Sequence, residues 1–217
     1  MKISQIVVPK DVLIISCFAV TLDLARVGFY GSTYFMYLIW NIFLAFLPFI
    51  VSAALLYHPL TKKYDYWVLI LGFFVWLFLL PNAPYMVTDL VHLGHNYSGS
   101  FWYDLIMLFS FAWAGILLAF YSLSHIEKLL RTKYSHKITN TAIAFILLFT
   151  SFGIYIGRFL RWNSWDIVAN PLYFFKNIAD IIMNPVANRA TYIFTTLLFI
   201  FMFVFYTAWK SGRKSQA

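Results

Sequence analysis

Residues 79–104 read LLPNAPYMVTDLVHLGHNYSGSFWYD, and they interrupt a chain that is otherwise rich in apolar and aromatic residues. The stretch places two prolines, two aspartates and two histidines between two apolar runs, and it holds no lysine or arginine. Ionisable residues are costly at membrane depth, so in an apolar chain such a stretch marks a surface element or a functional site. The sequence on either side of it indicates what kind of protein surrounds this site.

The composition is that of a membrane protein. Of the 217 residues, 62% are hydrophobic and 11% are charged, whereas charged residues make up about a quarter of a soluble domain. The formal net charge of +8 does not indicate nucleic acid as a partner, because the basic residues lie between long apolar runs, where they set orientation. The single cysteine, Cys17, excludes an internal disulfide. We therefore expect the lipid bilayer as the main partner of the chain.

Six stretches of the sequence are suited to crossing the bilayer. A transmembrane helix needs about 20 mostly apolar residues. The stretches that meet or nearly meet this requirement are residues 12–30, 34–57, 66–80, 103–124, 138–159 and 191–209. We predict an all-α fold, a polytopic membrane helix bundle of about six transmembrane helices, with residues 1–217 forming a single integral membrane domain.

The basic residues predict how the chain is oriented. Eleven of the 16 Lys and Arg residues lie in the two tails and in the second and fourth connections between the spans. Cytoplasmic segments carry the excess of Lys and Arg. Both termini are therefore predicted to be cytoplasmic, and the connection after the third span is predicted to face the outer side of the membrane.

Two of the outer connections have the pattern of short amphipathic helices. Between residues 83 and 93 the apolar residues gather on one side of a helical wheel, and Asn82 is a suitable cap for the first turn. The polar residues fall on the other side: Tyr85, Thr88, Asp89 and His92. Residues 172–183 repeat this division of apolar and polar residues. We predict that both helices lie in the membrane plane on the outer side.

Most of the unusual polar residues belong to the predicted outer half of the protein. They are Asp23, Arg26, Asn82, Asp89, His92, His95, Asp104, Arg158, Arg161 and Asp166. Ionisable groups in a membrane protein usually find partners. The simplest structural interpretation is that Asp23, Asp89 or Asp104 pairs with Arg158 or Arg161.

A metal site is one functional hypothesis for these residues. Asp89, His92 and His95 follow one another at spacings of three, and Asp104 lies nearby in the sequence. Carboxylate and imidazole groups suit zinc or another divalent ion. The spacing is not that of a recognised motif, and a divalent metal is the one cofactor for which the sequence offers candidate ligands.

An anion site is the second hypothesis. Arg158 and Arg161 would share a face if the fifth helix continued through them, and with Asn82 at a helix N-terminus and Asp166 they could bind a phosphate or carboxylate. Asp89 and His92 are then the candidate catalytic acid and base. The expected ligand is a small anionic molecule, including a lipid-linked precursor of the cell envelope.

Two further classes of protein compete with these hypotheses. In a small membrane carrier, residues 81–84 would be the break in a discontinuous helix, although the two halves of the chain show no internal repeat. A non-catalytic partner or assembly protein would use the polar residues only for structural pairing. The sequence indicates neither the oligomeric state nor whether the protein is an enzyme.

Three segments of the sequence resemble a known family. They are LLPNAPYMVTDLVHL (79–93), FWYDLIMLFSFAWAGILLAFYSL (101–123) and SFGIYIGRFLRWNSWDI (151–167). The family consists of bacterial integral membrane proteins of about this length and is catalogued as a domain of unknown function. The resemblance extends from the second span to the last, and it implies a bacterial plasma-membrane protein with several spans. It implies no activity, substrate or catalytic residue.

Overall fold

The computed structural model describes residues 7–58, 65–93, 100–162 and 169–214. These residues form helices and no strand. Six of the helical segments in this part of the chain are long and apolar enough to cross a membrane, which confirms the prediction of a polytopic helical bundle. The chain divides into two compact units, Met1–Lys133 (unit 1) and Tyr134–Ala217 (unit 2), and each is described by itself.

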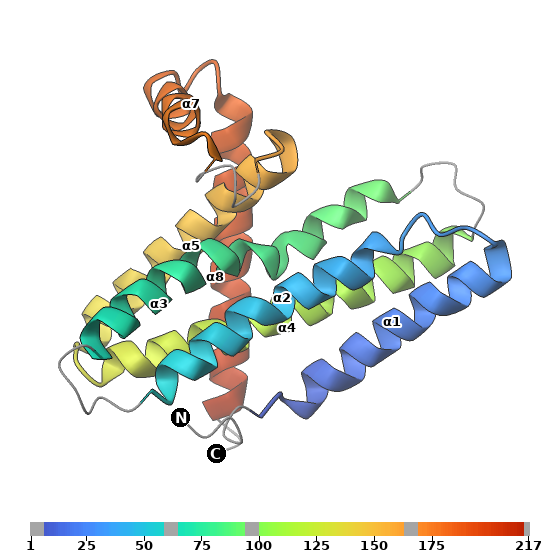
Figure 1. Cartoon of the computed structure of the whole chain (residues 1–217), viewed down its shortest axis with the longest axis horizontal. Coiled ribbons are helices and arrows are strands. Elements are labelled where there is room, and N and C mark those ends of the chain that lie inside the picture. Colours follow the sequence, from blue (N-terminus) through green and yellow to red (C-terminus); the bar gives the residue numbers. More distant parts are fainter. Residues whose placement is uncertain (1–6, 59–64, 94–99, 163–168, 215–217) are drawn as a thin grey trace. The chain divides into compact units, whose positions relative to one another are not determined.

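Unit 1 is built around its longest helix. Its elements are α1 (Lys10–Tyr30), α2 (Tyr37–Leu56), α3 (Asp65–Leu79), the 3₁₀ helices η2 (Leu80–Asn82) and η3 (Pro84–His92), and α4 (Phe101–Arg131). The helices α1, α2 and η3 pack directly on α4, while α3 packs on α2. Figure 1 shows α1 and α2 running alongside α4.

The helix α4 is buried because it is apolar all round and rich in small side chains. Every side chain from Ser110 to Leu123 is buried except that of Trp113. A helix without a polar face belongs in the interior of a bundle, and small residues allow neighbouring backbones to approach closely. The small residues of α4 in this stretch are Ser110, Ala112, Ala114, Gly115, Ala119 and Ser122.

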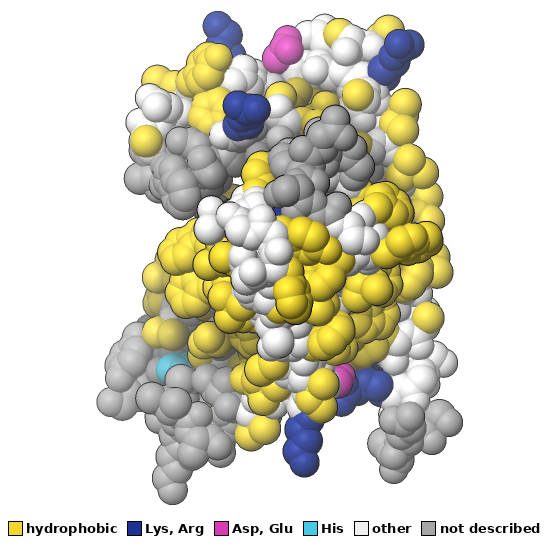
Figure 2. Space-filling view, turned by 90° about the vertical axis from the view of Figure 1, so that its right-hand side faces the viewer, with side chains coloured by type: hydrophobic (Ala, Val, Ile, Leu, Met, Phe, Trp, Pro, Cys, Tyr) yellow, Lys and Arg dark blue, Asp and Glu magenta, His cyan; other side chains and the backbone are white. Residues whose placement is uncertain are grey.

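The surface of the helices is apolar as well. Large hydrophobic side chains such as Phe18 (51% exposed), Trp40 (61%) and Trp102 (69%) lie on it. In Figure 2 hydrophobic side chains form a broad area in the middle of the visible face, and most of the Lys and Arg side chains in view lie above or below it. An apolar exterior of this extent suits contact with lipid rather than with water.

The third span changes its helix type at the two prolines. Pro81 and Pro84 lack the N–H groups that an α-helical ladder would need at these positions, and their rings clash with the carbonyl four residues earlier. The freed carbonyl of Leu80 instead accepts the Ala83 N–H at 3.1 Å, a 3₁₀ bond. The span therefore continues as 3₁₀ helix to His92, so the apolar segment is 66–92 rather than the predicted 66–80.

The 3₁₀ geometry decides which side chains of this segment are buried. A 3₁₀ helix has three residues per turn, so every third residue lies on the same face. Four residues at this spacing are at most 1% exposed: Leu80, Ala83, Met86 and Asp89. The helical wheel with 3.6 residues per turn was therefore wrong for Asp89, which shares a face with Met86 instead of lying opposite to it.

The predicted cap is also different from the observed one. Asn82 lies inside η2, and Ala83 precedes the first residue of η3, with no capping hydrogen bond from a side chain. Because α3, η2 and η3 follow one another without a break in the chain path, no exposed helix start is formed at Asn82. η3 packs along α4, and the orientation of residues 83–93 in the membrane plane stays a prediction.

A glycine on α4 allows η3 to approach. A β-carbon built at Gly115 would overlap the carbonyl oxygen of Ala83 and would lie 2.6 Å from the terminal methyl of Met86. The backbone of α4 and that of η3 are therefore in direct contact at Gly115. No residue larger than glycine fits this position without moving η3.

Unit 2 consists of two long helices and one short one. These are α5 (His136–Phe159), α7 (Pro171–Met183) and α8 (Arg189–Lys214), with α5 packed on α8. Phe159 and Tyr155 of α5 pack on Phe194 of α8, with ring centroids 5.2 and 5.7 Å apart. The helix α7 agrees with the short helix predicted at 172–183, and the hydroxyl of Tyr192 donates to its Ile181 carbonyl at 3.1 Å.

The contact at Gly115 yields a prediction about stability. Replacing Gly115 with Ala should lower the thermal stability of the purified protein in detergent, since overpacking a closely packed contact costs about 1–3 kcal/mol. The matched control is Gly28→Ala on α1, where an added β-carbon meets nothing within 4 Å. The control should keep or raise the melting temperature, because alanine favours helix over glycine. Equal melting temperatures for the two variants would contradict the contact.

Candidate functional site

The polar residues of unit 1 gather where four of its elements meet. They come from the end of α1, the start of α2, the end of η3 and the start of α4, which lie at the same end of unit 1 in Figure 1. We call this group the polar cluster. Its members are Asp23, Arg26, Tyr34, Asn41, Asp89, His92, Tyr103 and Asp104.

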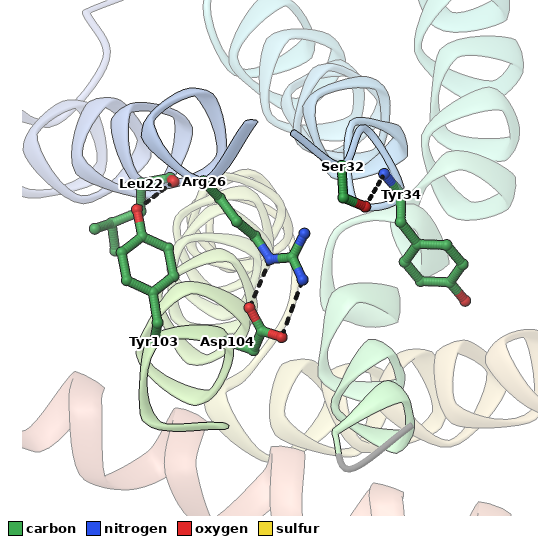
Figure 3. A network of polar contacts seen from close by, with 6 residues as sticks. All are labelled: Leu22, Arg26, Ser32, Tyr34, Tyr103 and Asp104. Atoms are coloured by element: carbon green, nitrogen blue, oxygen red, sulfur yellow. Dashed lines mark hydrogen bonds and ion pairs between the residues drawn. The ribbon is translucent and has the colours of Figure 1, made fainter. Parts of the chain in front are cut away.

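The strongest interaction of the polar cluster joins α1 to α4. Arg26, which is fully buried, donates through Nε to Asp104 Oδ1 at 2.6 Å and through Nη2 to Oδ2 at 3.2 Å. Figure 3 shows the guanidinium reaching from α1 to the carboxylate with this two-pronged geometry. The Phe35 ring lies 4.6 Å from the guanidinium carbon and adds a cation–π contact. The expected ion pair thus exists, but its cation is Arg26 rather than Arg158 or Arg161.

A second contact ties the same two helices together. The hydroxyl of Tyr103, in the first turn of α4, donates to the carbonyl of Leu22 on α1 at 2.6 Å (Figure 3). The Tyr103 ring also packs edge-on against Tyr30, with centroids 6.0 Å apart. Together with the ion pair, these contacts fix the end of α1 against the start of α4.

Two buried polar atoms of the cluster have no hydrogen-bond partner within the part of the chain that the structure describes. They are Oδ2 of Asp23 and Nη1 of Arg26. Asp23 is 1% exposed and lies one helical turn before Arg26. Most buried polar groups in native proteins are satisfied. These two atoms therefore mark a place where water or a ligand would complete the hydrogen bonding.

Asp89 and His92 lie in the polar cluster as neighbours on η3. Asp89 is 1% exposed, and its Oδ2 accepts a hydrogen bond from the side-chain amide of Asn41 on α2 at 3.2 Å. His92 is half-buried, with Nδ1 3.5 Å from the hydroxyl of Tyr34. The 3₁₀ geometry places them one turn apart on the same side of η3. A carboxylate and an imidazole are thus held side by side at one end of the bundle.

The arginines of the anion hypothesis belong to unit 2 and differ in backbone conformation. Arg158 lies half-buried in the last turn of α5, which ends at Phe159. Arg161 follows this end, exposed and with a positive φ of 56°. The condition under which the two would share a helix face is therefore not met. Asp166 lies outside the described residues.

The structure describes three of the four residues of the metal hypothesis. Asp89 and His92 are neighbours, His95 lies outside the described residues, and both carboxylate oxygens of Asp104 accept from Arg26. Within residues 7–58, 65–93, 100–162 and 169–214 there is no group of three or more His, Cys, Asp or Glu side chains that could hold a metal ion. The site of Asp89, His92, His95 and Asp104 stays a prediction.

A second polar network lies farther along α4. Trp76 Nε1 donates to Ser122 Oγ at 2.7 Å, and the single proton of Ser122 Oγ can be donated to the Pro48 carbonyl at 3.0 Å or to Ser52 Oγ at 3.1 Å. Ser52 Oγ also lies 3.1 Å from His125 Nδ1. Ser52 and Ser122 are fully buried. The network therefore satisfies buried hydroxyl and indole groups and links α2, α3 and α4.

Sequence reasoning missed two partners in the polar cluster. The side-chain amide of Asn41 donates a hydrogen bond to Asp89. Arg26 forms the ion pair with Asp104, which lies 78 residues later in the chain. A signal for Asn41 exists, because it is a single amide in the apolar span 37–56, and such residues usually face the bundle interior. The choice of Arg26 over Arg158 depends on how the helices pack, which the sequence pattern does not contain.

The ion pair yields the second prediction. Replacing Asp104 with Asn should lower the free energy of unfolding by roughly 3–5 kcal/mol, because it leaves a buried guanidinium without its counter-charge. The double variant Arg26→Met with Asp104→Leu should be more stable than Asp104→Asn, since it removes both charges. Chemical unfolding in mixed micelles measures all three proteins. A double variant less stable than Asp104→Asn would contradict the pairing.

Comparison with known proteins identifies the family. No curated protein and no solved structure matches the chain. The family model described as Protein of unknown function (DUF1361) matches residues 40–206, a range that begins in α2 and ends in α8. The three segments that carry the sequence resemblance lie inside this range. Since the match covers more than half of the chain, the protein belongs to the DUF1361 family.

Proposed function

We propose that the protein binds an anionic ligand and acts on it, with Asp89 and His92 of the polar cluster as its catalytic residues. The observation that carries this proposal is the pair formed by Asp89 and His92. The Asp89 carboxylate is 1% exposed and accepts a hydrogen bond from Asn41. The His92 ring is half-buried beside the hydroxyl of Tyr34. Burying ionisable groups at membrane depth is costly, and such groups mark functional sites by default. A carboxylate next to an imidazole is suited to general acid–base chemistry.

The charges of the polar cluster determine which residues are proposed to bind the anionic group. Unit 1 contributes three aspartates, Asp23, Asp89 and Asp104, against one guanidinium, and that guanidinium is already paired with Asp104. This cluster by itself is acidic and does not favour an anion. We therefore propose Arg158 and Arg161, with Asn82 and Asp166, as the residues that bind the anionic ligand, and Asp89 and His92 as the catalytic residues.

The location of this activity is part of the proposal. The apolar exterior supports a lipid environment, and the distribution of Lys and Arg favours cytoplasmic termini. We propose that the protein lies in a bacterial plasma membrane with the polar cluster on the outer side. A ligand at this position could be lipid-linked, because its chain would enter the bilayer beside the helices.

A lipid phosphate is the direct probe of this proposal. Native mass spectrometry of the purified protein should show retention of dioleoyl phosphatidate in preference to dioleoyl phosphatidylcholine, by at least about tenfold in apparent affinity, because guanidinium groups bind phosphate oxygens bidentately. The double variant Arg158→Gln with Arg161→Gln should lose this preference. Asp11→Asn, which changes a carboxylate in the first turn of α1, is the control and should bind as the wild type does.

The catalytic part of the proposal is tested separately. The wild-type protein is incubated with phosphatidate, and mass spectrometry of the lipids should then reveal a product. The variants Asp89→Asn and His92→Gln should still bind phosphatidate but should not form this product. Wild-type protein that shows no preference for phosphatidate contradicts the proposed function. If Asp89→Asn and His92→Gln are as active in cells as the wild type at equal protein level, the non-catalytic partner or assembly protein is favoured.

A small carrier is the second candidate, and a specific observation favours it. The third span changes from α-helix to 3₁₀ helix at Pro81 and Pro84, where Ala83 lies against Gly115 in the interior of the unit. Discontinuous helices of this kind form the substrate sites of several transporter folds. Proteoliposomes should then accumulate inorganic phosphate above the level of empty liposomes, whereas an enzyme or binding protein should not transport it.

A further inference from the structure

Arg161 has an unusual backbone for its residue type. Among the described residues it is the one non-glycine residue with a positive φ, at 56°. It follows the C-terminal end of α5. The N–H groups of Leu160 and Trp162, on either side of it, both donate hydrogen bonds to the Ile156 carbonyl, at 3.1 and 3.4 Å. Helices often end on a left-handed residue, and that residue is usually glycine because a β-carbon is strained there.

The contacts that the structure describes for Arg161 do not explain why an arginine, rather than a glycine, occupies this position. Its side chain is exposed. Within the described residues, no hydrogen bond, ion pair or ring contact involves its guanidinium. A residue held in a sparsely populated backbone region suggests that its side chain has a function.

The neighbouring residue fixes the backbone at this point. The ring of Trp162 packs against Tyr173 and Phe174 of α7, with centroids 5.5 and 5.4 Å apart. Because Trp162 is held by α7 and Leu160 is held by α5, the backbone between them has little freedom. The α-carbon of Arg161 is thus anchored on both sides while its guanidinium is exposed to solvent or ligand.

Arg158 has a sufficient structural explanation. It lies in the last turn of α5 with ordinary helical geometry and is half-buried. A cation near the C-terminal end of a helix interacts favourably with the unsatisfied carbonyl groups there. Its presence requires no ligand, in contrast to that of Arg161.

The geometry points to Arg161 as the arginine that makes the main contact with the anionic group of the ligand, with Arg158 in a mainly structural role. This inference rests on the proposed function and deepens it by assigning different roles to the two arginines. The group recognised is a phosphate or carboxylate, which the planar guanidinium fork contacts through two parallel hydrogen bonds. Lysine at this position would keep the charge and the strained backbone but lose the fork.

Substitution by glycine separates the two roles of Arg161. Arg161→Gly removes the side chain and relieves the strain, so the melting temperature in detergent should rise by roughly 2 °C or more, while the affinity for dioleoyl phosphatidate should fall at least about tenfold. Arg161→Lys should weaken binding without raising the melting temperature. Arg158→Gln should lower the melting temperature and should weaken the binding of phosphatidate less than Arg161→Gly does. Arg189→Gln, which removes an exposed charge of the same unit, is the control for charge alone.

The outcomes distinguish this inference from the proposed function. If the wild type prefers phosphatidate and Arg161→Gly binds it equally well, Arg161 is not the anion-binding residue and the inference fails while the proposed function stands. A fall in the melting temperature of Arg161→Gly also overturns it, because the backbone strain would then be absent. If the wild type shows no preference for phosphatidate, the proposed function and this inference fail together.

Discussion

The close approach of the Ala83 carbonyl to Gly115 is the constraint on which the arrangement of unit 1 depends. Pro81 and Pro84 prevent the third span from continuing as an α-helix, and the 3₁₀ geometry that replaces it has a period of three residues. Only the absence of a side chain at Gly115 lets this segment lie directly on α4. Its buried face then extends from Leu80 to Asp89, so an aspartate enters the protein interior as a consequence of helix geometry.

The polar cluster follows from that placement. Asp89 meets Asn41 of α2, while the start of α4 presents Asp104 to Arg26 of α1. Both carboxylates thus find partners on helices distant in the sequence, as expected for ionisable groups in a membrane protein. His92 lies at the edge of the cluster and is less buried than Asp89. The arrangement combines a rigid ionic contact between α1 and α4 with an acid–base pair on η3, and this combination supports a site that holds its own geometry before a ligand binds.

The sequence predicted the spans well and the contacts poorly, for a physical reason. Long apolar runs determine which segments cross a bilayer, so the predicted ends of five spans differ little from the observed helices, with two exceptions. The helix α4 continues to Arg131, where Glu127 pairs with Arg131 at 2.8 Å, and α8 continues to Lys214. The helical wheel was wrong for Asp89 because it assumed 3.6 residues per turn in a segment that two prolines had changed. The partners of Asp104 and Asp89 depend on packing between helices, which no local pattern encodes.

The account rests on the period of three between Leu80 and His92, and cysteine scanning measures that period directly. In a Cys17→Ser background, single cysteines at the non-proline positions 80–92 would be labelled in native membranes with a small thiol reagent. The account predicts the lowest labelling at Leu80, Ala83, Met86 and Asp89, with higher values between them. Labelling minima that instead recur every 3.6 residues, with a cysteine at Asp89 labelled as readily as one at Thr88, would contradict it.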